Sequence, residues 1–173
     1  MDNSAGPDTR YSTLSIGLHW VMLALLAAVY ASIQLREIYP RGSDIREALK
    51  AWHFSLGLSV FVLVWVRIAV RAVSPRPHPA SSWDARLAML MHLALYVLMV
   101  AMPILGWLAL SASGKPVPFF GLELPALVGP GKALAEQAEE VHETLGTVGY
   151  WLVGAHAAAA LFHHYVLRDG TLR

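Results

Sequence analysis

Four long apolar stretches, separated by short polar connections, dominate the pattern of the chain. They cover roughly residues 14–35, 52–73, 87–110 and 141–167. Each reaches the length of about 20 residues that an α-helix needs to cross a bilayer, and few or no charged residues interrupt it. The pattern therefore predicts an all-α membrane protein, with residues 1–173 forming a single domain built as a bundle of four transmembrane helices.

The composition supports a membrane protein and excludes several kinds of chemistry. Hydrophobic residues make up 56% of the 173 residues and charged residues only 14%, whereas soluble domains carry about 25% charged residues. The formal net charge of +1 gives no indication of nucleic-acid binding. The chain has no cysteine, which excludes disulfides, iron–sulfur clusters, thiolate zinc sites and thiol catalysis.

The positive charges in the connections indicate the orientation of the helices. Seven of the 13 Lys and Arg residues lie on the side of the two termini and six on the other side, which favours cytoplasmic termini. The connections 37–50 and 111–131 then lie on the outer side, and the second is expected to cover the outer face. The first stretch also resembles a signal peptide, but its length and the three stretches that follow favour a retained helix.

Four histidines lie in or at the ends of these apolar stretches: His19, His53, His142 and His156. An imidazole in hydrocarbon is costly unless it has a strong partner. With cytoplasmic termini, His53 and His142 share the outer level and His19 and His156 the inner half. His142 and His156 are 14 residues apart in the fourth stretch, so in a helix they project from nearly the same face. The arrangement predicts two sites at which imidazoles from facing helices hold a metal or a flat macrocycle.

Several alternatives to this interpretation stay open at this point. Gly57 and Gly146, each four residues after a histidine, leave room for a porphyrin face, although small residues also favour close helix packing. Structural zinc usually requires four close ligands, so haem held by two histidines fits better. His163 follows His156 by seven residues and could replace it in the inner pair. We expect His92 to be a structural hydrogen-bonding residue and His78 a solvated loop residue.

The same residues carry a resemblance to a known family. Over roughly residues 11–172 the chain resembles the bacterial cytochrome b561 family, and within it the superoxide oxidases. The resembling segments are Ser15-Ile16-Gly17-Leu18-His19-Trp20, Arg36…Pro40-Arg41, His53-x3-Gly57, Val66-Arg67…Arg71, His142-Glu143-Thr144-Leu145, Gly149-Tyr150, and His156-Ala157-Ala158-Ala159-Ala160-Leu161-Phe162-His163-His164-Tyr165.

The resemblance implies a four-helix protein of the bacterial inner membrane that encloses two b haems. It would oxidise superoxide to oxygen on the periplasmic side and pass the electrons to ubiquinone, without an obligate protein partner. His53 and His142 would be the axial ligands of the outer haem, and His19 and His156 those of the inner haem. His163 would then be available to contact the quinone.

Basic residues near the helix ends have candidate roles in such a protein. Arg67 and Arg71, four residues apart, could contact haem propionates or act as topology signals. A cationic entrance would attract the superoxide anion, and Arg36, Arg41, Lys50 and Lys132 are the candidates. Anchoring of helix ends is the alternative role for these four residues.

Two other functions compete with a superoxide oxidase. One is a cytochrome b electron-transfer subunit that serves a partner dehydrogenase or hydrogenase, although the short connections offer it little docking surface. The other is a haem-free membrane protein that binds a metal such as zinc.

Overall fold

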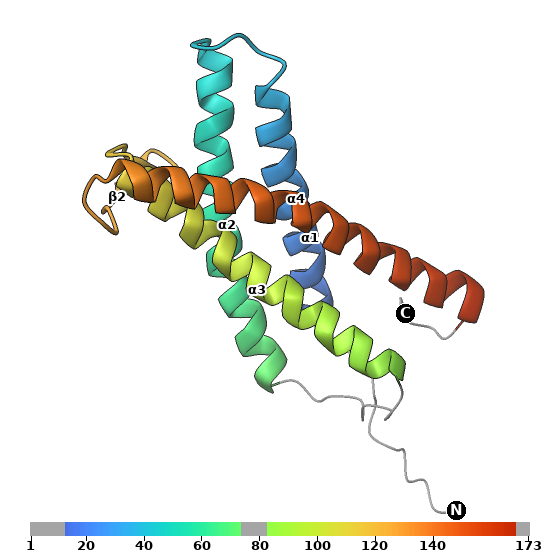
Figure 1. Ribbon diagram of the computed structural model, residues 1–173. Helices are drawn as coiled ribbons and strands as arrows, with labels where there is room; N and C mark the ends of the chain where they lie inside the picture. Colours follow the sequence, from blue (N-terminus) through green and yellow to red (C-terminus); the bar gives the residue numbers. More distant parts are fainter. Residues whose placement is uncertain (1–12, 74–82, 169–173) are drawn as a thin grey trace, which may run out of the picture. The chain divides into compact units, whose positions relative to one another are not determined.

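The computed structural model of the chain describes residues 13–73 and 83–168, which separate into two compact units on either side of residue 82. The first unit is a helical hairpin. It consists of α1, Thr13–Arg36, and α2, Asp44–Val73. The two helices run antiparallel and side by side (Figure 1). His78, which the sequence predicts to be a loop residue, lies outside the described residues.

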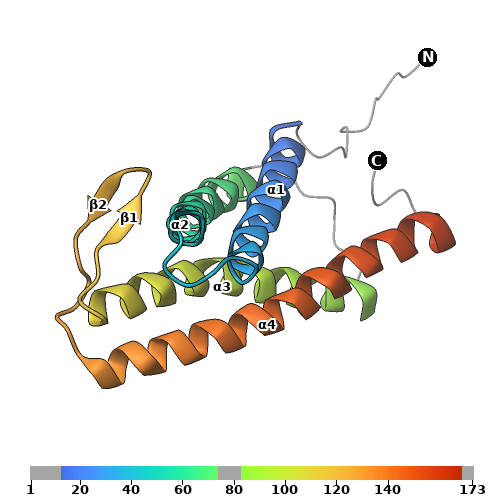
Figure 2. The same cartoon turned by 90° about the horizontal axis from the view of Figure 1, so that it is seen from above.

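The second unit is also a helical hairpin, with a small strand pair inserted at its turn. Its long helices are α3, Trp83–Ala112, and α4, Lys132–Phe162, and they pack antiparallel against each other (Figure 2). Between them come β1, Val117–Phe119, and β2, Leu122–Leu124. The chain continues from α4 into η1, a π-helical turn over His163–Leu167.

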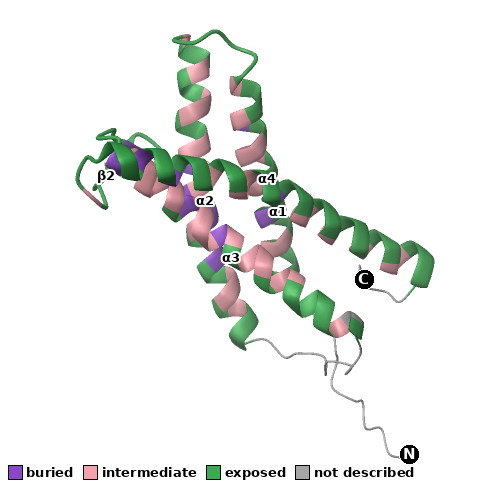
Figure 3. Cartoon of the chain, viewed as in Figure 1, coloured by how far each residue is buried: buried purple, intermediate pink, exposed green. Residues whose placement is uncertain are grey.

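The four long helices confirm the predicted all-α membrane class. Each is long and apolar enough to cross a membrane. In the most apolar windows of α1 to α4 only 11%, 17%, 11% and 6% of the residues are buried, so most of their surface is half-buried or exposed (Figure 3). An apolar surface of this extent is unfavourable in water, and the hydrocarbon of a bilayer can cover it. The helices therefore expose the surface that a bilayer requires.

The first connection is shorter than the sequence pattern predicts. We expected a connection over residues 37–50, but α2 already begins at Asp44. Ser43 caps this helix, because its hydroxyl accepts a hydrogen bond from the backbone N–H of Arg46 at 3.4 Å. Asp44 and Glu47 lie in the first turn, where negative charge interacts favourably with the helix dipole.

The second connection contains a β-hairpin that the sequence interpretation missed. Val117 pairs with Leu124 and Phe119 with Leu122. The turn residues Phe120 and Gly121 have φ values of 48° and 85°, as a tight hairpin turn requires. The sequence signal for this hairpin was a short apolar run, residues 117–120, that is followed by a glycine.

Backbone and side-chain hydrogen bonds fix the second connection to the end of α3. The indole N–H of Trp107 donates to the Pro125 carbonyl at 3.0 Å, and the Leu127 backbone N–H donates to the hydroxyl of Ser111 at 3.1 Å. Ser111 and Val117 are almost fully buried. The connection is thus ordered and is held against α3 of the same unit. Its predicted covering of the outer face stays a prediction.

Candidate functional site

Each helical hairpin contributes two of the four predicted ligand histidines. His19 lies in α1 and His53 in α2, whereas His142 and His156 both lie in α4, and all four are half-buried. Since α4 is one continuous helix across both positions, the two imidazoles at 142 and 156 project from nearly the same face. Each predicted pair takes one histidine from each hairpin, so the pairing itself stays a prediction.

His53 is held by the backbone of the neighbouring helix. Its Nδ1 lies 3.1 Å from the carbonyl oxygen of Val29 in α1. A carbonyl only accepts, so Nδ1 carries the proton and Nε2 presents its lone pair. A Cβ added at Gly57 would meet no atom within 4 Å, and the predicted porphyrin space beside this histidine stays a prediction.

His142 is held in the same way within the second hairpin. Its Nδ1 lies 3.0 Å from the carbonyl oxygen of Met102 in α3, which again leaves the lone pair on Nε2. The ring also lies against Gly106: a Cβ there would come within 3.3 Å of Cε1 of His142. At Gly146, which the sequence suggested as a space for a cofactor, an added Cβ would lie 3.6 Å from the methyl group of Met102.

His19 has a different kind of neighbour. Nη1 of Arg67, in α2, lies 3.0 Å from Nδ1 of His19. A guanidinium only donates, so here Nδ1 is the acceptor, the reverse of its role in His53 and His142. Arg71 lies exposed in the last turn of α2. Arg67 is thus hydrogen-bonded to a candidate ligand, His19. The predicted contacts of Arg67 and Arg71 with haem propionates stay predictions.

His156 lies beside a second histidine, His92 of α3. The two ring centroids are 5.4 Å apart and the ring planes cross at 77°. Nδ1 of His92 lies 2.6 Å from the carbonyl oxygen of Ala88. His92 is thus hydrogen-bonded as the sequence predicted, and it is also the imidazole next to a candidate ligand.

His163 begins the π-helical turn η1 at the end of α4. No sequence pattern indicated this turn, in which the helix widens; π-helical turns often occur at functional sites. The next residue, His164, has a buried Nδ1 atom with no hydrogen-bond partner among the described residues. Both residues lie in η1, directly after the end of α4 that the predicted topology places on the cytoplasmic side.

The described residues give no support to a metal site of the zinc type. Within residues 13–73 and 83–168 no group of three or more His, Asp or Glu side chains could hold a metal ion. The backbone-anchored histidines lie in different hairpins, so their predicted role as haem ligands stays a prediction.

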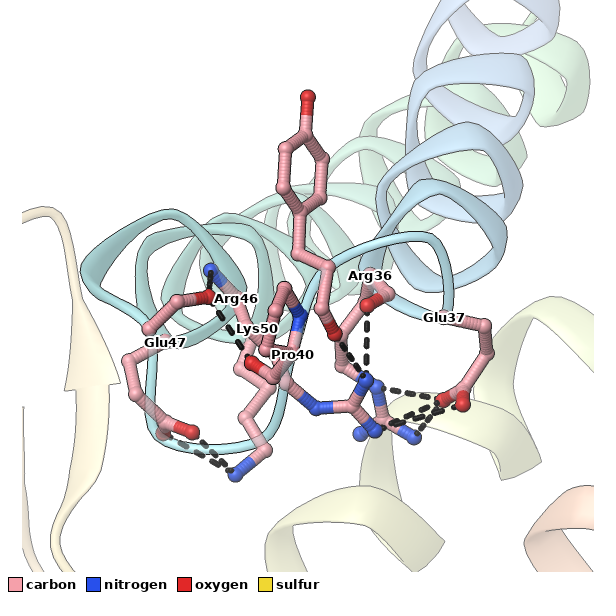
Figure 4. Close-up of polar contacts among 8 residues, drawn as sticks. Arg36, Glu37, Pro40, Arg46, Glu47 and Lys50 are labelled. Atoms are coloured by element: carbon pink, nitrogen blue, oxygen red, sulfur yellow. Dashed lines mark hydrogen bonds and ion pairs between the residues drawn. The ribbon is translucent and has the colours of Figure 1, made fainter.

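Most of the basic residues considered for superoxide attraction are paired with carboxylates. Arg36 and Arg46 both bond to Glu37, and Lys50 bonds to Glu47 (Figure 4). The Arg36 hydrogen bond lowers the pKa of Glu37, and Arg46 adds to this effect, so the carboxylate stays charged at neutral pH.

The other two basic candidates differ from each other. Lys132 lies 3.7 Å from Glu136, one helical turn away. Arg41 is exposed, and it forms no hydrogen bond or ion pair with any residue in the described ranges. Of the four candidates, Arg41 is the one that has no carboxylate partner within the described residues.

Arg46 organises the first connection, although the sequence interpretation assigned it no role. Its guanidinium donates to the carbonyl oxygens of Arg36 and Tyr39 at 2.8 and 2.9 Å, as well as to Glu37. Only 11% of its side chain is exposed. Because carbonyls at the end of a helix lack internal partners, Arg46 caps the end of α1.

Replacing Arg46 by alanine should destabilise the protein more than replacing Arg41. We expect Arg46→Ala to lower the free energy of unfolding by about 1–2 kcal/mol, because two carbonyls lose a charged donor. Arg41→Ala should change it by less than about 0.5 kcal/mol, as is usual for an exposed side chain. Thermal unfolding of the two variants in the same detergent measures the difference, and equal effects would contradict this role of Arg46.

Comparisons with known proteins find a matching family model and several similar sequences. A family model described as prokaryotic cytochrome b561 matches residues 10–173. "Cytochrome b561 homolog 1" of Escherichia coli is 36% identical over 166 residues, which cover 94% of each chain. "Probable superoxide oxidase CybB" of Yersinia pestis is 37% identical over 94% of this chain and 93% of its own. "Cytochrome b561 homolog 2" of Escherichia coli is 30% identical over 95% of this chain and 89% of its own.

Proposed function

The chain belongs to the prokaryotic cytochrome b561 family, and from this premise we propose that it is a superoxide:ubiquinone oxidoreductase with two b haems. Membership in the family and four membrane-capable helices make it a multi-pass protein of the bacterial inner membrane that transfers electrons. The family also implies b-type haem. The number of haems, the donor and the acceptor are the content of the proposal.

The observation that carries the proposal is the matched anchoring of His53 and His142. Each donates from Nδ1 to a backbone carbonyl of the neighbouring helix in its own hairpin. Histidines that bind a metal usually donate their other N–H in this way, which fixes the tautomer and the ring orientation. We therefore assign the two residues as axial ligands of the outer haem.

His19 and His156 are the proposed ligands of the inner haem. Ligation of His19 through Nε2 places the proton on Nδ1, which then cannot accept from Arg67. Arg67 would have to turn away from the ring, and its guanidinium would then be available for a carboxylate such as a propionate. Arg71, one turn further along α2, extends the same positive surface.

Electron entry would occur at the outer side. Bound haem would supply a one-electron couple, and His53 and His142 would hold the haem nearest to the entrance. Superoxide would give up one electron there and leave as oxygen. In our proposal Arg41 is the main residue that attracts superoxide, because carboxylates lie beside Arg36, Lys50 and Lys132 and offset their charge.

Electron exit would occur at the cytoplasmic end of α4. Two superoxide anions supply the two electrons that reduce one ubiquinone to ubiquinol, and two protons are taken up. His163 can hydrogen-bond a quinone carbonyl and pass on a proton, and it begins the widened turn η1. The similarity to a protein named as a probable superoxide oxidase supports the choice of donor.

Rapid mixing of the purified, oxidised protein with superoxide tests the proposal. We expect reduced b-haem absorbance within the mixing time, its absence when superoxide dismutase is added first, and reoxidation when a ubiquinone analogue follows. Reduction no greater than in the dismutase control would overturn the choice of superoxide as donor. Reduction only by a co-purifying partner enzyme would identify the protein as an electron-transfer subunit instead.

A further inference from the structure

Two of the four candidate ligands, His53 and His142, share one feature. Nδ1 of each donates a hydrogen bond to a carbonyl oxygen on the neighbouring helix of the same hairpin. For His156 the neighbouring helix is α3, and the residue of α3 beside its ring is His92, at 5.4 Å between centroids. His92 thus lies on the helix that corresponds to the one supplying the acceptor for His53 and for His142.

The tautomer of His92 determines what it can offer to His156. Its Nδ1 lies 2.6 Å from the Ala88 carbonyl oxygen, and since that oxygen only accepts, Nδ1 carries the proton. In a neutral imidazole, Nε2 is then the acceptor. Two imidazoles joined by an N–H···N bond of about 3 Å have centroids a little over 5 Å apart, which agrees with the observed separation.

We infer that His92 is a positioning residue for the inner haem: its Nε2 accepts a hydrogen bond from Nδ1 of His156 and leaves Nε2 of His156 to the iron. The inference rests on the proposed function, because it takes His156 as a ligand. It assigns to His92 the place that the backbone carbonyls of Val29 and Met102 hold for the outer pair. The anchor of the inner ligand is thus a side chain that substitution can remove, unlike a backbone carbonyl.

The hydrogen bond should change the electronic properties of the inner haem. An acceptor at Nδ1 increases the basicity of a ligating imidazole, which stabilises the ferric state and lowers the midpoint potential. Loss of the acceptor should therefore raise the potential of the inner haem and leave the outer haem unchanged. We expect a change of about tenfold in the ratio of reduced to oxidised inner haem, which is 59 mV for a one-electron couple.

Two substitutions separate this role from simple packing. His92→Phe keeps an aromatic ring that can pack edge-to-face against His156 but has no acceptor. His92→Gln loses the ring but places a carbonyl oxygen close to the position of Nε2. A positioning role predicts a raised potential in the Phe variant and a nearly unchanged potential in the Gln variant.

A redox titration of both variants and the wild-type protein, followed by haem absorbance, tests the inference, with the low-spin ferric EPR signal as a second readout. The shift should persist when His142→Ala is added, because it belongs to the inner haem. Equal shifts in the Phe and Gln variants, a shift only in the Gln variant, or no shift in either would overturn the inference.

The wild-type measurement keeps the two proposals separate. A wild-type protein without two b-haem signals contradicts the proposed function before any variant is considered. A wild-type protein with two signals, together with variants that behave alike, contradicts only the role of His92.

Discussion

His142→Ala is expected to reduce the haem content from about two per protein to about one, because the outer haem loses one of two axial ligands. The remaining ligand, His53, cannot hold the iron on both faces. The inner haem should keep its ferric EPR signal and its potential, since both of its proposed ligands are intact. Quantification of extracted haem against protein, with a reduced-minus-oxidised spectrum, measures the change.

Double variants extend this prediction to the pairing of the histidines. If His53 and His142 bind the same haem, the His53→Ala/His142→Ala protein should retain about one haem, like either single variant. The His19→Ala/His53→Ala protein should retain almost none, because each haem loses a ligand. His78→Ala is the matched control and should keep both haems. A protein that loses both haems in the first double variant but keeps one in the second would contradict the pairing across the hairpins.

The length of the apolar stretches was sufficient to predict the helices, but the polar details at their ends were not predictable in the same way. Hydrophobicity over 20 residues decides whether a segment can span a bilayer. The start of α2 at Asp44 depends instead on one hydroxyl, that of Ser43, and on a few charges. The β-hairpin depends on a turn at Phe120 and Gly121. Such short-range signals are weak in a sequence dominated by apolar periodicity.

The sequence pattern also could not predict which hydrogen-bond partner Nδ1 of each candidate ligand has. Spacing along α4 predicted that His142 and His156 share a face, and the continuous helix confirms that they lie on it. Whether Nδ1 meets a carbonyl, a guanidinium or another imidazole depends on the register between neighbouring helices. That register follows from side-chain packing along the whole hairpin, so the roles of Met102, Arg67 and His92 required the structure.

The count of basic residues illustrates a similar limit. Arg36 and Lys50 appear in the sequence as cations near the connection between α1 and α2, but the structure places Glu37 and Glu47 beside them. A carboxylate at about 3 Å offsets most of the potential that an arginine or lysine exerts further away. Charge counts alone therefore could not select the residues that would attract superoxide.

Gly106→Val is expected to remove the outer haem, although residue 106 contributes no ligand. A Cβ at this position would come within 3.3 Å of Cε1 and 3.6 Å of Nδ1 of His142, and valine adds two methyl groups beyond it. The ring must then move and lose its hydrogen bond to Met102. Loss of such an orienting partner typically costs about 10–100-fold in metal affinity. Gly106→Ala should have a smaller effect, because the ring needs to move by only a few tenths of an ångström.

Gly154→Val is the matched control for the change in α3. Residue 154 is also a glycine in a long helix, a Cβ there would meet nothing within 4 Å, and it points almost opposite to His156 on α4. Valine is a better helix former than glycine, so neither variant should lose helix, which circular dichroism checks. Haem titration should show weakened outer-haem binding only for Gly106→Val. Equal loss in both variants would indicate a general effect of bulk in the membrane. Full haem retention in Gly106→Val would show instead that the contact between α3 and His142 does not control the outer site.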